Sequence, residues 1–291
     1  MRTKRINIIA IILLALLAVT PSSYAAGAPD SKVGISLVRA AKYGDIEKIK
    51  SLIEQGANIN ERSESGRTAL IEAVAKDDTA SVALLLEKGA DVAIAGNEGE
   101  TAMSIAAFKG NIAVVRSLVE KKADVNFPDN DGETPLMQAI NYRENTDVVK
   151  YLLDHGANIN ATDKNGQTAL AIAVSEGISN MAKMLVDAGA DVNIRDNRGK
   201  NAMVIAAEEN NPEVVKMLID KIAKIDDESD KGKTALIYAA AKGNEDLVKL
   251  FIEKKADVNH KDKNGQSVMH YAGEKPGNEK VMEILKAAGA K

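Results

Sequence analysis

The feature that most constrains the fold is a sequence period of 33 residues. A glycine recurs at intervals of 33 or 34 residues, at Gly66, Gly99, Gly132, Gly166, Gly199, Gly232 and Gly265. Each glycine opens a similar phrase, such as GRTALIEAV or GKTALIYAA, and a second phrase such as EQGANIN or DAGADVN follows in step. A fixed period of this length is typical of a solenoid, in which one structural unit is stacked many times.

The pentapeptide DKNGQ shows what the period means locally. It occurs at residues 163–167 and again at 262–266, three periods apart. Asn-Gly and Asp-Gly pairs favour tight turns between paired strands. We therefore interpret these segments as hairpin tips that the stack uses repeatedly, rather than as a duplicated ligand site.

Each period also predicts two short helices. Apolar residues at Leu70, Ala73 and Val74 give the first helix a narrow apolar side, and Val82, Leu85 and Leu86 give the second helix its own. Pro135 lies at the first position of one such helix, where its missing N–H does no harm. The expected N-terminal caps of the first helices are Thr68, Thr101, Thr134, Thr168, Asn201, Thr234 and Ser267.

Glycine is expected to end most of the second helices in a left-handed conformation. These glycines are Gly56, Gly89, Gly156, Gly189 and Gly289. Lys122, Ile222 and Lys255 take the same place in three units. Because a β-branched residue is strained in that conformation, the unit with Ile222 should end its helix differently or be locally less stable.

The chain resembles the ankyrin-repeat family, whose T-P-L-H-x-A phrase and 33-residue spacing are matched from about Val33 to Lys291. The resemblance implies an all-α repeat solenoid of about eight stacked repeats, each a helix-turn-helix with a β-hairpin loop. The His of the family phrase is kept only at His270, so the hydrogen bonds that it makes between repeats are not expected elsewhere. The expected repeats are 33–65 as the N-terminal cap, 66–98, 99–131, 132–165, 166–198, 199–231, 232–264, and 265–291 as the C-terminal cap.

The N-terminus predicts a secretory signal peptide over residues 1–25, followed by a short linker at 26–32. Three basic residues precede an apolar run from Ile8 to Val19, which is shorter than the roughly 18 to 20 residues that span a bilayer. We expect cleavage after Ala25, a periplasmic or alternatively secreted product, and no membrane insertion afterwards. An uncleaved membrane anchor is the alternative.

The net charge restricts which kinds of ligand are expected, and the cysteine content restricts how the protein can be stabilised. Removal of residues 1–25 would take away three of the 38 basic residues and none of the 42 acidic ones, which leaves a net charge of −7 with neutral histidines. An acidic solenoid is a poor ligand for nucleic acid or anionic lipid. The chain has no cysteine, so packing rather than disulfides must hold the exported protein together.

No pattern in the sequence indicates an enzyme, a cofactor or a metal site. The three histidines, His155, His260 and His270, are scattered over separate repeats, whereas a zinc site needs a convergent cluster. The turn PDNDGE superficially resembles a calcium loop, but Phe127 stands where the loop needs an oxygen ligand and Gln138 where it needs a glutamate. The chain contains no nucleophile elbow or phosphate-binding loop, and its carboxylate clusters, such as Glu208–Glu209, fall in slots that vary between repeats.

A protein partner is the remaining expectation. The resemblance to ankyrin-repeat proteins implies that a partner binds on the concave side. It further implies that the residues around each tip glycine and those after the first helix determine which partner is bound. Aromatics and arginine dominate interface hot spots, so we expect contact residues at Phe108, Phe127, Tyr142, Arg143, Lys109, Glu100, Glu133 and Tyr43. The alternative is structural: Phe127 packs on its own hairpin, and Tyr142 covers an inserted turn.

We therefore expect a monomeric, non-enzymatic scaffold of the cell envelope that inhibits or escorts a secreted or periplasmic enzyme. Delivery into a host cell, as an effector that binds host proteins, is the alternative. A hydrolase is disfavoured because no nucleophile constellation is present.

Overall fold

The computed structural model describes residues 32–140, 145–221 and 224–291. The predicted signal peptide, nearly all of the linker, Tyr142, Arg143 and Ile222 lie outside these ranges. Within them, no helix is both long enough and apolar enough to cross a membrane.

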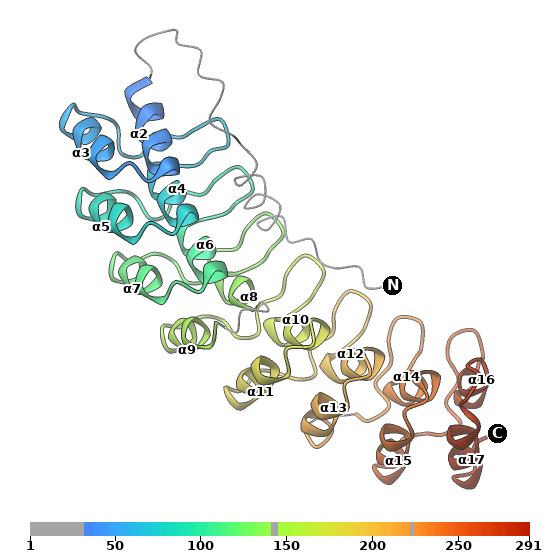
Figure 1. The fold of residues 1–291 in the computed structure, drawn as a ribbon. Coiled ribbons are helices and arrows are strands. Elements are labelled where there is room, and N and C mark those ends of the chain that lie inside the picture. The colour runs from blue at the N-terminus through green and yellow to red at the C-terminus, as the bar shows by residue number, and fades with distance from the viewer. Residues whose placement is uncertain (1–31, 141–144, 222–223) are drawn as a thin grey trace. The chain divides into compact units, whose positions relative to one another are not determined.

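The described residues form sixteen helices, which are arranged in consecutive pairs along the chain (Figure 1). They fall into two compact units, which divide between residues 130 and 131 and are described separately. The first unit contains α2 (Lys32–Tyr43), α3 (Ile46–Glu54), α4 (Ala69–Lys76), α5 (Thr79–Glu87), α6 (Ala102–Lys109) and α7 (Ile112–Glu120). The second contains α8 (Pro135–Ala139), α9 (Thr146–Asp154), α10 (Ala169–Ser175), α11 (Ser179–Asp187), α12 (Ala202–Glu208), α13 (Pro212–Leu218), α14 (Ala235–Lys242), α15 (Glu245–Glu253), α16 (Val268–Gly273) and α17 (Glu279–Ala287).

The first helix of each pair is buried almost throughout. In α4, for example, every residue from Ala69 to Ala75 is buried, because neighbouring first helices pack on both sides of it within the unit. Small alanines allow these helices to approach closely, and the second helices bury one face only, as α15 does with Leu247, Val248 and Phe251. Each unit is therefore held by contacts between neighbouring repeats, as in other solenoids.

The predicted caps of the first helices are confirmed. All seven side-chain oxygens accept a hydrogen bond from the backbone N–H three residues later, and Pro135 begins α8. Thr101 and Ser104 form a reciprocal pair, in which each side chain accepts from the other's backbone N–H.

The ends of the second helices also follow the prediction. The five glycines have positive φ, and Lys122 and Lys255, at φ 64° and 65°, take the left-handed conformation too. The helix before Ile222 does end differently: α13 stops at Leu218 after seven residues, whereas its counterparts α5 and α15 have nine.

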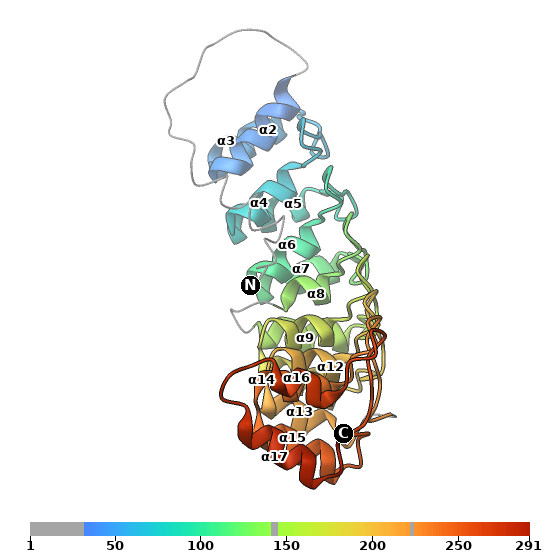
Figure 2. The same cartoon turned by 90° about the vertical axis from the view of Figure 1, so that its right-hand side faces the viewer.

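The loops between repeats lie along one side of the helices within each unit (Figure 2). The expected paired strands are reduced to isolated bridges, which join Ala95 to Thr101, Glu228 to Thr234 and Lys261 to Ser267; the described residues contain no longer ladder. Backbone hydrogen bonds within the turn, such as that from the Asp163 N–H to the Gln167 carbonyl, are joined by side-chain bonds. In both DKNGQ segments the aspartate carboxylate accepts from two backbone N–H groups of its own turn, those of Asn165 and Gln167 in the first case.

Candidate partner-binding surface

Successive turn tips are joined to one another by backbone hydrogen bonds. In the first unit the N–H of Asn97 donates to the Ser65 carbonyl at 3.0 Å, and the N–H of Asn130 donates to the Glu98 carbonyl at 3.0 Å. In the second unit the donor–acceptor pairs are Lys164 to Asp131, Asn197 to Asn165, Asp230 to Arg198 and Lys263 to Lys231. These bonds fix the register of neighbouring tips, so the residues that follow the tip glycines line up in a column.

Two columns of side chains therefore run along each unit, one from the tips and one from the first helices, and most of the helix column is buried. Their residue types vary although the scaffold around them does not. The tip column reads Arg67 and Glu100 in the first unit, then Glu133, Gln167, Lys200, Lys233 and Gln266 in the second. The helix column reads Glu72 and Ile105, then Gln138, Ile172, Ile205, Tyr238 and Tyr271.

Two of the expected contact residues are buried, which corrects the prediction that they are exposed. Phe108 is only 8% exposed, because its place in the last turn of the first helix is sheltered: Ala75 in the preceding repeat is 6% exposed. Glu100 is 2% exposed because it lies against the preceding tip, where its Oε1 is 2.7 Å from Arg67 Nε.

The other expected contact residues are distributed over both units. Tyr43 and Phe127 are exposed, at 58% and 38%, and Lys109 is half-buried, all in the first unit. Glu133 is half-buried in the second unit, where its carboxylate accepts a hydrogen bond from Gln138 Nε2 at 2.7 Å.

A cluster that the sequence reasoning did not select lies in the last three repeats. The Lys233 ammonium lies 4.1 Å from the centre of the Tyr271 ring and 6.0 Å from that of Tyr238, and Lys200 Nζ lies 5.4 Å from the Tyr238 ring. Attraction between a cation and an aromatic face stabilises this arrangement. We call Lys200, Lys233, Tyr238 and Tyr271 the lysine–tyrosine face. Its signal in the sequence is the 33-residue spacing between the two lysines and between the two tyrosines.

The charges of the lysine–tyrosine face are held in defined places. Lys200 forms an ion pair with Glu208, with Nζ–Oε2 at 2.6 Å, whereas Lys233 forms no ion pair with any described residue. The Tyr271 hydroxyl donates to Asp262 Oδ2 at 2.6 Å and lies 2.7 Å from Gln266 Oε1. Burial and the bond to Asp262 raise the pKa of Tyr271, so this phenol stays protonated.

Asp262 remains ionised beneath this face. Burial alone would favour its neutral form, but the hydrogen bonds from Tyr271 and from the N–H groups of Gln266 and Asn264 lower the pKa of its carboxyl, and Lys233 adds to the effect. Lys233 and Tyr238 are the half-buried members of this face, whereas Lys200 and Tyr271 are buried, each 6% exposed, and Tyr271 is fixed by its bond to Asp262.

A buried ionic cluster occupies the corresponding columns of the first unit. Arg67, Glu72 and Glu100 are all nearly enclosed, and Glu72 Oε1 is 4.0 Å from Arg67 Nη1. Oε2 of Glu72 is the one buried side-chain polar atom of the described residues that has no hydrogen-bond partner. Burial, helped by the charge of Glu100 and opposed by Arg67 and Lys42, raises the pKa of Glu72.

The raised pKa of Glu72 predicts that the free energy of unfolding depends on pH. Because the folded-state pKa is raised, protonation of Glu72 stabilises the folded chain fully below the unfolded value near 4.5, and this contribution is lost as the pH rises through the folded pKa. Glu72→Gln should therefore raise the free energy of unfolding near neutral pH, by about 1 kcal/mol, and flatten its dependence above pH 4.5. Urea unfolding at several pH values measures both effects; Glu64→Gln on an exposed tip is the control, and an unchanged pH profile would refute the assignment.

The described residues contain no group of three or more His, Cys, Asp or Glu side chains placed to hold a metal ion. The histidines make local contacts instead: the ring of His155 stacks on Tyr151, and His260 Nε2 lies 2.8 Å from the Gly232 carbonyl.

Comparison with known families agrees with this architecture. A family model for ankyrin repeats (three copies) matches the chain in overlapping segments, at residues 37–129, 94–163, 123–196, 159–229 and 202–291. The chain therefore belongs to the ankyrin-repeat family, whose members generally mediate protein–protein interaction and are typically not enzymes. None of the curated proteins compared with it matches.

Proposed function

We propose that this protein is an exported scaffold that binds a partner protein through its lysine–tyrosine face. The observation that carries the proposal is Lys233, whose ammonium is held between two tyrosine rings without a carboxylate partner among the described residues. Tyrosine combines a large apolar area with few rotatable bonds, and it is enriched at interface hot spots. A face whose side chains are already fixed loses little conformational entropy on binding.

The expected patch in the first unit is proposed as a second contact. Tyr43 and Phe127 expose aromatic surface there, and Lys109 adds a half-buried cation.

We further propose that the mature protein acts in the periplasm as a monomer, where it inhibits or escorts a secreted or periplasmic enzyme. Support comes from the N-terminal signal pattern, the complete lack of cysteine and the acidic mature charge. An acidic surface keeps such a protein soluble and away from nucleic acid.

Export is tested by cell fractionation and by N-terminal sequencing of the mature protein. The expected N-terminus is Ala26, and the expected location is the periplasmic fraction. Recovery of the mature protein only outside the cell would contradict the periplasmic role and favour a secreted effector, and an intact N-terminus in the membrane fraction would contradict cleavage.

Partner binding is tested by chemical cross-linking in the periplasm followed by affinity measurement with the purified partner. The double variant Lys233→Ala with Tyr238→Ala should weaken binding by roughly tenfold or more, since it removes two candidate hot-spot residues. Tyr43→Ala with Phe127→Ala tests the second contact in the same way. The control is Lys216→Ala with Lys280→Ala, which removes exposed lysines from the second helices. Equal affinity of the folded Lys233 and Tyr238 double variant and the wild type would remove the lysine–tyrosine face as the binding site.

A further inference from the structure

Lysine follows the tip glycine in two successive repeats of the second unit, but only one of these two lysines has a carboxylate partner. Lys200 Nζ lies 2.7 Å from Oε1 and 2.6 Å from Oε2 of Glu208, which is eight residues further along the chain, at the end of α12. Lys233 holds the same position one repeat later, and the residue eight places after it is Ala241. The later repeat therefore keeps the cation and lacks the carboxylate that the earlier repeat places beside it.

Two hydrogen-bond donors of the lysine–tyrosine face remain for a ligand or water. An ammonium group has three N–H donors and no acceptor, and the Lys233 side chain forms no ion pair or hydrogen bond with any residue that the structure describes. The Tyr238 hydroxyl likewise has no hydrogen-bond partner within the described ranges. Both side chains are half-buried, so a ligand reaches them without unfolding the repeat.

The buried carboxylate beneath the face already accepts three hydrogen bonds. Asp262 accepts from the Tyr271 hydroxyl at 2.6 Å and from two backbone N–H groups of its own turn, both at 2.9 Å. It forms no ion pair with Lys233, which contacts the Tyr271 ring instead. The carboxylate of Asp262 therefore stabilises the turn and leaves the donors of the ammonium to another acceptor.

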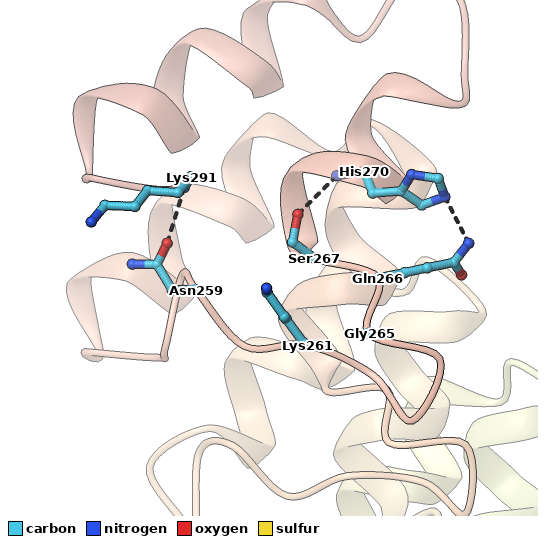
Figure 3. Close-up of a pocket in the computed structure, with 7 residues that line it drawn as sticks. All are labelled: Asn259, Lys261, Gly265, Gln266, Ser267, His270 and Lys291. Atoms are coloured by element: carbon cyan, nitrogen blue, oxygen red, sulfur yellow. Dashed lines mark hydrogen bonds between the residues drawn. The ribbon is translucent and has the colours of Figure 1, made fainter.

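The repeat that follows Lys233 supplies no carboxylate to it either. Gln266 replaces the lysine there, and its Nε2 lies 2.9 Å from His270 Nε2 (Figure 3). Glu274 corresponds to Glu208, but its Oε1 lies 3.4 Å from the same nitrogen of His270. No carboxylate of the described residues thus takes the place beside Lys233 that Glu208 takes in the preceding repeat.

We propose that the lysine–tyrosine face binds an Asp or Glu side chain of the partner protein, which pairs with Lys233 as Glu208 pairs with Lys200. The Tyr238 hydroxyl is the second donor available to the carboxylate, and apolar atoms of the partner cover the Tyr238 ring. Hydrogen bonds between charged groups are stronger than those between neutral groups. The two tyrosine rings already position the ammonium, which reduces the entropy lost on binding. The inference rests on the proposed partner-binding function and names the group that the face recognises.

The test uses the mature chain and the capped pentapeptide acetyl-Ala-Leu-Glu-Leu-Ala-amide, whose glutamate lies between apolar residues. Titration followed by NMR of the lysine and tyrosine side chains should give saturable shifts at Lys233 and Tyr238, and binding should weaken at high salt. The matched peptide with glutamine in place of glutamate should bind more weakly by roughly tenfold or more, because it offers no charged acceptor.

A matched pair of variants separates charge from size. Ala241→Glu restores the arrangement of the preceding repeat, so that the chain supplies its own carboxylate to Lys233. It should weaken binding of the glutamate peptide by roughly tenfold or more, because two like charges would then compete for one cation. Ala241→Gln is of similar size and neutral, and it should weaken binding much less. Circular dichroism checks that both variants fold, and an NMR pH titration should find a lowered pKa for the introduced carboxyl.

Absence of saturable peptide binding, shifts at other lysines, equal binding of the two peptides, or full affinity of the folded Ala241→Glu variant would each overturn the inference. Tighter binding of a glutamine peptide with a free C-terminus would identify a chain end rather than a side chain, and would overturn it too. The proposed function is tested separately with the partner itself. Partner binding that is weakened by Lys233→Ala with Tyr238→Ala but not by Ala241→Glu would support that function while refuting the carboxylate contact, and partner binding that neither variant weakens would refute both.

Discussion

Arg67→Met should lower the free energy of unfolding by about 3–5 kcal/mol, since it leaves the Glu100 carboxylate buried without its cation. Arg67 and Glu100 are 33 residues apart, and both side chains are almost fully enclosed. Glu72 lies in the same cluster, so removal of Arg67 would leave two buried acidic groups. Urea unfolding monitored by circular dichroism measures the loss.

Two further variants establish whether charge causes this loss. Lys183→Met removes a cation from an exposed pair with Asp187 and should cost about 1 kcal/mol or less. The double variant Arg67→Met with Glu100→Gln should recover part of the stability, because the uncompensated charge is gone while an oxygen remains to accept from the Glu98 N–H. If the double variant is less stable than Arg67→Met, lost packing rather than an unpaired charge explains the effect.

Gly232→Ala should destabilise the second unit more than Gly265→Ala does. Both glycines have nearly the same φ, 76° and 77°, so an alanine at either place adds about 1–2 kcal/mol of left-handed strain. At Gly232 the new methyl group would also meet the backbone nitrogen of Lys263 at 2.7 Å, which should add about 1–3 kcal/mol.

Thermal and urea unfolding of the two variants in parallel isolates the contribution of tip stacking. Because the left-handed strain is common to both, the difference between them reports the contact with the next tip. Equal destabilisation would mean that the tips can separate at no cost, and would contradict the stacked register described above.

The fold followed from the sequence because its rules are local and repeated. The capping side chain at the start of each first helix and the glycine at each turn are determined by backbone hydrogen bonding and φ angles within a few residues, and the 33-residue period repeats them. Even Lys122 and Lys255, which replace glycine, adopt the expected left-handed conformation. Of the expected paired strands, the described residues keep only three isolated bridges.

The surface was harder to predict because exposure depends on neighbours that are a full repeat away. Phe108 occupies a slot that the family pattern places at the surface, yet the packing of adjacent first helices buries it. Tyr238, in the first helix of a later repeat, is only half-buried, and its ring lies near Lys200 and Lys233. Residue type alone does not distinguish these outcomes.

The bonds between tips run from backbone to backbone, and this has an evolutionary consequence. A mutation that changes a tip side chain leaves those bonds intact, provided that the glycine stays. Outside the buried Arg67–Glu100 pair, the chain can therefore change what it recognises without first being stabilised elsewhere. The position after the tip glycine already holds four residue types in this one chain: lysine, glutamate, glutamine and arginine.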